Sequence, residues 1–230
     1  MSYKIPDIKN IFSKLYKKTD IYVLVFFFCY FYFVISEKNS IFAKRKKTML
    51  DVIYINTLPD TNDFGVLFDG LDANILVNPT HEQVTEFLSS STNRLIVCGH
   101  GNELGVFGEM NVTGDSITFG DYCIDRSNVE LLRQREVIGI WCFAGNFADR
   151  YGLHGFFTSM FISNVMEAAD FGFSTDEDTV RRENIFFSTA VRRLIDEDVP
   201  LSQWPEILQS EAHTDIPFVG FNYEALAYYE

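Results

Sequence analysis

Two apolar runs, each ending on a reactive side chain, decide the fold of this chain. Residues 96–101 read IVCGHG, with His100 next to the end, and residues 137–142 read VIGIWC, with Cys142 last. Uninterrupted apolar runs of this length are typical of strands buried on both faces, which belong to parallel sheets. In such sheets, functional groups collect beyond the carboxyl ends of neighbouring strands. The two runs therefore predict that His100 and Cys142 share one edge of a sheet.

The surrounding pattern alternates strands with helices. Strands are expected at residues 51–57, 73–77, 94–99, 136–142, 156–162 and 216–221. Helices are expected at residues 81–89 after Thr80, 127–134 after Ser127, and 176–196 after Thr175. Residues 105–107 (GVF) and 116–119 (SITF) indicate a small hairpin. This alternation predicts an α/β domain over residues 49–230, with a mostly parallel central sheet flanked by helices.

The first 48 residues differ in composition from the rest. They carry nine lysines and Arg45 against three acids, and residues 21–36 (IYVLVFFFCYFYFVIS) are almost continuously apolar. Three interpretations of this basic, apolar N-terminal extension stay open: a short membrane anchor, translated sequence upstream of the true start, or a core strand. The apolar stretch is short for a span, which needs about 20 residues.

Residues 49–230 are strongly acidic. They contain 29 acids, nine arginines and no lysine, so their formal net charge is −20. Without a basic stripe to replace phosphate counterions, nucleic acid is excluded as a partner. An acidic surface favours solubility, or the approach of cationic substrates.

The four cysteines, Cys29, Cys98, Cys123 and Cys142, form no C-x-x-C pair. Their spacing predicts neither a disulfide framework nor a metal site, and it is typical of a reducing compartment. No metal and no organic cofactor is expected.

A histidine and a cysteine at adjacent strand ends are suited to nucleophilic catalysis, because the thiolate attacks while the imidazole manages the proton. The paired motifs His100-Gly101 and Cys142-x-x-Gly145, each after an apolar strand and 42 residues apart, resemble those of the caspase-like cysteine peptidases. That clan includes caspases, metacaspases, clostripain, gingipain and legumain, and the resemblance covers roughly residues 51–162.

The resemblance implies a caspase-like α/β sandwich and a role for each motif residue. Cys142 would be the nucleophile, His100 the general acid and base, and the backbone amides of Gly101 and Cys142 the oxyanion hole. The chain departs from the family at Trp141, where a small residue is usual, and at Ile140, where many members carry a polar or charged one.

Four residues are candidates for a substrate pocket beside the dyad. Ile140 and Trp141 precede the nucleophile, and Asn146 follows it closely. His154, in YGLHGFF, either lines the same cleft or lies on a surface loop.

The expected function is cleavage of protein or peptide substrates, with basic residues favoured at the cleavage point. An inactive interaction scaffold and another cysteine hydrolase or amidase are the alternatives. A cytoplasmic domain is expected, membrane-anchored through residues 21–36 if the extension is translated, and a dimer is left open.

Overall fold

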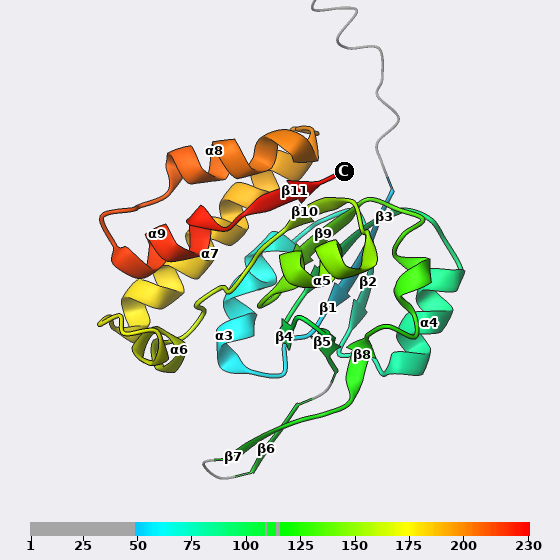
Figure 1. The fold of residues 1–230 in the computed structure, drawn as a ribbon, viewed down its shortest axis with the longest axis horizontal. Helices are drawn as coiled ribbons and strands as arrows, with labels where there is room; N and C mark the ends of the chain where they lie inside the picture. The colour runs from blue at the N-terminus through cyan, green and yellow to red at the C-terminus, as the bar shows by residue number, and fades with distance from the viewer. Residues whose placement is uncertain (1–48, 109, 114–115) are drawn as a thin grey trace, which may run out of the picture. The chain divides into compact units, whose positions relative to one another are not determined.

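The computed structural model describes residues 49–108, 110–113 and 116–230 of the chain (Figure 1). Six strands form one sheet in the order β11-β10-β9-β3-β1-β2, and every neighbouring pair is parallel except β10 with β11. The strands are β1 (Leu50–Tyr54), β2 (Asn74–Val77), β3 (Arg94–Cys98), β9 (Val137–Ile140), β10 (Gly155–Phe157) and β11 (Ala227–Tyr229). The predicted mostly parallel sheet is confirmed.

Helices cover both faces of this sheet, so the inner strands β1, β3, β9 and β10 bury both of their sides, whereas the edge strands β2 and β11 are more exposed. Along β1, Val52 and Tyr54 pack into one core, and Ile53 packs into the other. The first core lies against α3 (Pro59–Asn62), α6 (Val165–Asp170), α7 (Glu177–Asp196), α8 (Trp204–Glu211) and α9 (Pro217–Glu224). The second lies against α4 (His81–Ser89) and α5 (Ala144–Tyr151). Burial on both faces explains the uninterrupted apolar runs.

Short strands after β3 make two smaller sheets. One joins β4 (Gly101–Asn102), β5 (Gly105–Phe107) and β8 (Tyr122–Ile124), and the other pairs β6 (Met110–Thr113) with β7 (Ser116–Phe119). The expected hairpin between GVF and SITF is therefore wrong in its pairing, because β5 pairs with β4 and β8. Three 3-10 turns complete the elements: η1 (Asp63–Leu67), η2 (Val129–Leu131) and η3 (Leu201–Gln203).

Several expected elements form, but some of them begin or end at other residues than expected. The helix α4 begins after Thr80, whose hydroxyl accepts from the Gln83 amide in a reciprocal capping box. The long helix α7 forms as expected, but its cap is Asp176 rather than Thr175. The strand expected at 156–162 is only the short β10.

Two expected elements are wrong. Residues 217–221 belong to the helix α9 and Ile216 precedes it, because Pro217 occupies the first helical turn, where a missing N–H costs nothing. A short apolar run does not distinguish a strand from a buried helix, and the last strand is instead β11. Residues 127–134 form only the turn η2, because the Ser127 hydroxyl donates to Asp125 instead of capping a helix.

Within residues 49–230, no helix combines the length and the apolar character needed to cross a bilayer. The three interpretations of residues 1–48, including an anchor at 21–36, lie outside the described residues.

A close approach between two strands of the main sheet depends on Gly155. Its φ is +134°, and a Cβ there would lie 2.0 Å from the Val137 carbonyl oxygen of β9. We expect Gly155→Ala to push β10 from β9 and to lower the free energy of unfolding by more than about 3 kcal/mol. Urea unfolding of the whole chain measures the change.

The matched control is Gly152→Ala. Gly152 is also left-handed, with φ +62°, but nothing lies within 4 Å of its added Cβ. This variant should lose only about 1 kcal/mol. Equal losses in the two variants would contradict the close packing of β10 on β9.

Candidate active site

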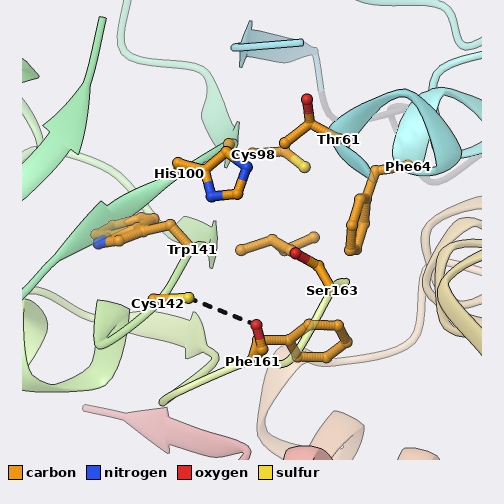
Figure 2. A pocket seen from close by; sticks show the side chains of 10 residues that line it. Thr61, Phe64, Cys98, His100, Trp141, Cys142, Phe161 and Ser163 are labelled. Carbon is orange, nitrogen blue, oxygen red and sulfur yellow. Dashed lines mark hydrogen bonds between the residues drawn. The ribbon is translucent and has the colours of Figure 1, made fainter. Parts of the chain in front are cut away.

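His100 and Cys142 stand beyond the carboxyl ends of two adjacent parallel strands. In the register of β3 with β9, Cys98 is opposite Ile140, and the Gly99 amide donates to the Ile140 carbonyl at 3.1 Å. The adjacency expected of the two apolar runs is therefore confirmed. Both side chains line one pocket (Figure 2), together with Thr61, Phe64, Cys98, Gly99, Ile140, Trp141, Phe161 and Ser163.

A carboxylate from a third element faces the histidine. Asp60 lies in α3, which follows β1, the other neighbour of β3. Its Oδ2 and Oδ1 lie 3.2 and 3.3 Å from Nε2 of His100, and the two side chains are 11% and 12% exposed. An aspartate this close and this well shielded fixes which ring nitrogen of the histidine faces it.

The ion pair shifts the pKa of both partners. Burial opposes the charge on each, but the hydrogen bond to Asp60 and its charge, with the charge of Glu167, raise the pKa of His100. The hydrogen bonds from His100, Asn164 and Ser163 lower the pKa of Asp60 against its own desolvation. Asp60 is thus held ionised, and the imidazole binds a proton more tightly than in water.

The segment before α6 holds the carboxylates in place. Asn164 donates its side-chain amide to Asp60 at 2.9 Å, and the Ser163 hydroxyl donates at 3.1 Å. Ser163 also donates its backbone N–H, at 2.7 Å, to Glu167. One turn of chain therefore positions Asp60 and Glu167 together.

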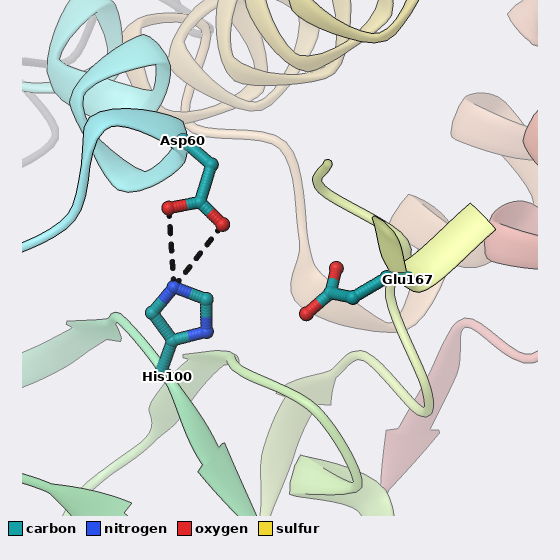
Figure 3. A group of neighbouring side chains, drawn as sticks. All are labelled: Asp60, His100 and Glu167. Carbon is teal, nitrogen blue, oxygen red and sulfur yellow. Dashed lines mark hydrogen bonds and ion pairs between the residues drawn. The ribbon is translucent and has the colours of Figure 1, made fainter. Parts of the chain in front are cut away.

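Glu167 lies beside the pair of Asp60 and His100 (Figure 3). One donor atom from each of the three side chains lies within 4.8 Å of the others. Burial raises the pKa of Glu167, although the Ser163 amide and the nearby His100 act in the opposite direction.

The thiol of Cys142 is protonated in this site. Burial first, then the charges of Glu167 and Asp60, raise its pKa to about 12, while a hydrogen bond with the Phe161 backbone acts in the opposite direction. Its Sγ donates to the Phe161 carbonyl at 3.5 Å, and among the described residues no hydrogen bond joins Cys142 to His100. The resting arrangement is a neutral thiol beside the hydrogen-bonded Asp60 and His100.

The chain turns sharply after Cys142 to begin α5. Phe143 has φ +64°, a left-handed conformation that costs a non-glycine residue about 1 to 3 kcal/mol and is typical of functional sites. The amides of Trp141 and Phe143 donate to Thr158 Oγ1 and the Ser159 carbonyl. The Cys142 amide between them donates to no acceptor in the part of the chain that the structure describes.

Trp141 is a structural residue as well as a pocket wall. Its side chain is buried, packs edge-on against Phe147 and Phe157, and donates to the Asn102 carbonyl at 3.3 Å. A Cβ on Gly101 would lie 2.4 Å from the indole Cδ1. Gly101 must therefore be a glycine, because Trp141 leaves no room for a side chain there.

The other candidate pocket residues have different positions. Ile140 lines the pocket but is only 3% exposed. Asn146 is exposed on α5 and does not line the pocket. His154 is at the opposite end of the sheet, where its carbonyl accepts from the Val137 amide at the start of β9, so of the two places considered for it the cleft is wrong.

Three residues of the site escaped sequence analysis. Asp60, Ser163 and Glu167 come from parts of the chain where no motif stands out, and only the fold brings them to His100. Their one signal was position, since Asp60 follows the first strand and residues 163–167 follow the fifth strand of the main sheet.

Comparison with protein-family models, curated proteins and solved structures finds no match to this chain.

The negative charge of Glu167 opposes ionisation of the thiol, which generates a prediction. Glu167→Gln should lower the pKa of Cys142 and speed its alkylation at pH 8. Lowering the pKa of Cys142 by half a unit alone would raise the alkylation rate roughly threefold, because it raises the thiolate fraction by that factor. Mass-spectrometric mapping of the alkylated peptide, in chelator-treated buffer, measures the rate at Cys142.

Glu177→Gln removes the same charge from the first turn of α7 and serves as control. It should leave the rate within experimental error of the natural chain. An unchanged or slower rate in Glu167→Gln would show that Glu167 does not control the thiol.

Proposed function

We propose that this chain is a caspase-like cysteine peptidase in which Cys142 is the nucleophile and His100 the general base. The observation that carries the proposal is the pair of side chains beyond the ends of adjacent parallel strands, facing one pocket. A thiol and an imidazole brought together in this way are the groups that acyl transfer through a thioester requires.

The reaction begins from the neutral thiol and the neutral imidazole, the form that His100 takes above its raised pKa. His100 takes the proton of Cys142 as the sulfur attacks the peptide carbonyl carbon, and a tetrahedral intermediate with a negative oxygen forms. The amides of Cys142 and Gly101 would donate to this oxygen. The Cys142 amide has no competing acceptor among the described residues, which supports this role.

Collapse of the intermediate breaks the C–N bond. His100 returns its proton to the departing amine, and the acyl group stays on Cys142 as a thioester. Water then attacks the thioester, with His100 as base, and the carboxylic acid product leaves the free thiol.

Asp60 would act through His100 as a positioning residue. A carboxylate on one ring nitrogen leaves the other nitrogen to exchange the proton, and it stabilises the imidazolium that forms during attack. The contact of Asp60 with Nε2 at 3.2 and 3.3 Å fits this division of roles.

The raised pKa of Cys142 favours a general-base mechanism over a preformed thiolate–imidazolium pair. It is equally compatible with an inactive scaffold, whose thiol would not react at all. An amidase or another cysteine hydrolase would use the same dyad on a different substrate.

Basic side chains are the proposed preference at the cleavage point. An open pocket next to the dyad is lined by Asp60, Asp63 and Glu177, with Arg181 as its basic residue. Ser163 lines this pocket and the one that contains Cys142, so the two adjoin. Its acids, in a domain of net charge −20, favour a cationic side chain.

A cytoplasmic setting is also proposed for residues 49–230, since Cys98, Cys123 and Cys142 are all free thiols. An anchor through residues 21–36 and a dimer stay predictions of the sequence.

The catalytic roles predict a graded loss of activity. Digestion of a peptide library should be abolished by Cys142→Ala and lowered by Asp60→Asn, the latter by about 10² to 10⁴ in kcat if it acts as in other triads. Because Asp60 raises the pKa of His100, Asp60→Asn should also move the rising limb of the pH–kcat/KM profile to lower pH.

A merely structural role of Asp60 would change stability without moving that limb. Digestion by the natural chain that persists in Cys142→Ala would reject the proposed nucleophile. No cleavage and no labelling of Cys142 by a thiol-directed activity probe would favour the scaffold.

The substrate preference gives a separate prediction. Cleavage products should end in Lys or Arg, and Asp63→Asn should lower kcat/KM for a Lys peptide about fivefold relative to an Ala peptide, through lost charge attraction. Glu206→Gln, on the exposed side of α8, is the matched control and should leave kcat/KM unchanged for both the Lys peptide and the Ala peptide. Cuts concentrated after Asp, Asn or apolar residues would contradict the preference.

A further inference from the structure

Asp60, His100 and Glu167 form a compact group of donor atoms from three separate elements. Asp60 comes from α3, His100 follows β3, and Glu167 comes from α6. One atom of each lies within 4.8 Å of the other two. The group lies beyond the carboxyl ends of the strands, where parallel sheets bind ligands.

The distance between Asp60 and His100 matches that between two ligands of one metal ion. Two donors at about 2.0 to 2.1 Å from zinc, at a tetrahedral angle, are about 3.3 Å apart. The Asp60 oxygens lie 3.2 and 3.3 Å from His100 Nε2. An ion could therefore replace the proton between them with little movement of either side chain.

Glu167 supplies the third donor. The backbone N–H of Ser163 donates to its Oε2, which the Ser163 hydroxyl also approaches to 3.1 Å, and its other oxygen has no hydrogen-bond partner among the described residues. That oxygen is available to an ion. Because the donor atoms of the group lie within 4.8 Å and tetrahedral ligands lie about 3.3 Å apart, rotation of the side chain is enough to bring Glu167 to the ion.

The charge of the group also calls for a cation. It brings two partly buried carboxylates together, and among the described residues the ring of His100 is the only cationic group that pairs with either. Arg181, the nearby arginine of the adjoining pocket, pairs with Asp63 instead. Two buried carboxylates with one shared partner are costly, and a divalent ion removes the deficit.

We propose that Asp60, His100 and Glu167 bind one divalent ion of the zinc class. An imidazole with two carboxylates selects zinc and related transition metals over calcium or magnesium, which prefer oxygen alone. Three protein ligands leave a fourth position for water or substrate. The sequence predicted no metal because its cysteines lack metal spacing, and this donor set uses no cysteine.

Binding would govern the dyad, a consequence that rests on the proposed function. An ion on His100 Nε2 occupies the position of its proton and lies between the ring and Asp60, so the hydrogen bond between the two side chains is lost. The imidazolium could then no longer be stabilised by that carboxylate during attack. Zinc would hold the peptidase inactive until it is withdrawn.

The test is calorimetric titration of the chelator-treated whole chain with zinc chloride, followed by the same titration of variants. We expect about one equivalent of zinc per chain. Glu167→Gln should weaken binding at least tenfold, and His100→Ala should weaken it further. Cobalt chloride should give a visible ligand-field absorption without a thiolate-to-cobalt charge-transfer band.

Two variants distinguish this site from binding by the adjoining pocket or by the thiol. Glu177→Gln removes one negative charge from the adjoining pocket, and Cys142→Ala removes the nearby thiol. Both should bind zinc within about threefold of the natural chain. Substoichiometric binding, equal affinity in Glu167→Gln, or a cobalt–thiolate band lost in Cys142→Ala would overturn the site. Because the measurement is of binding, it decides the proposal whether or not the chain cleaves peptides.

Discussion

The parallel pairing of β3 with β9 determines where every group of the candidate site lies. Because Cys98 is opposite Ile140, the two residues after each strand emerge at the same edge of the sheet. A slip of one residue would turn Cys142 to the other face and would send the side chains that fit one core into the other. The pairing of β1 with β3 then brings α3 and its aspartate to the same edge.

The sequence indicates much of this framework, since strands buried on both faces leave a plain apolar signal in residues 94–99 and 136–140. It does not indicate α9, because a six-residue apolar run with a proline is compatible with a strand or with a first helical turn. It also cannot indicate Glu167, whose part in the site depends on a contact 67 positions along the chain from His100. Roles that arise from long-range contacts leave no local pattern, whereas His-Gly and Cys at strand ends do.

The charges of the site have opposite effects on His100 and on Cys142. Asp60 stabilises a cation on His100, and the same carboxylate together with Glu167 opposes an anion on Cys142. A site built to store a thiolate would place positive charge near the sulfur instead. The arrangement therefore favours the protonated, less nucleophilic form of the sulfur.

The tryptophan before the cysteine has a consequence for the backbone on either side of the pocket. Its indole lies against Gly101 and donates to the Asn102 carbonyl, so it holds the chain after His100 against the chain at Cys142. Dipoles that are already aimed where charge develops need no reorganisation at the moment of reaction, which is the largest saving that many enzymes make. In the proposed reaction, a bulky residue at this position would thereby preorganise the backbone amides of Gly101 and Cys142, which lie far apart in the sequence.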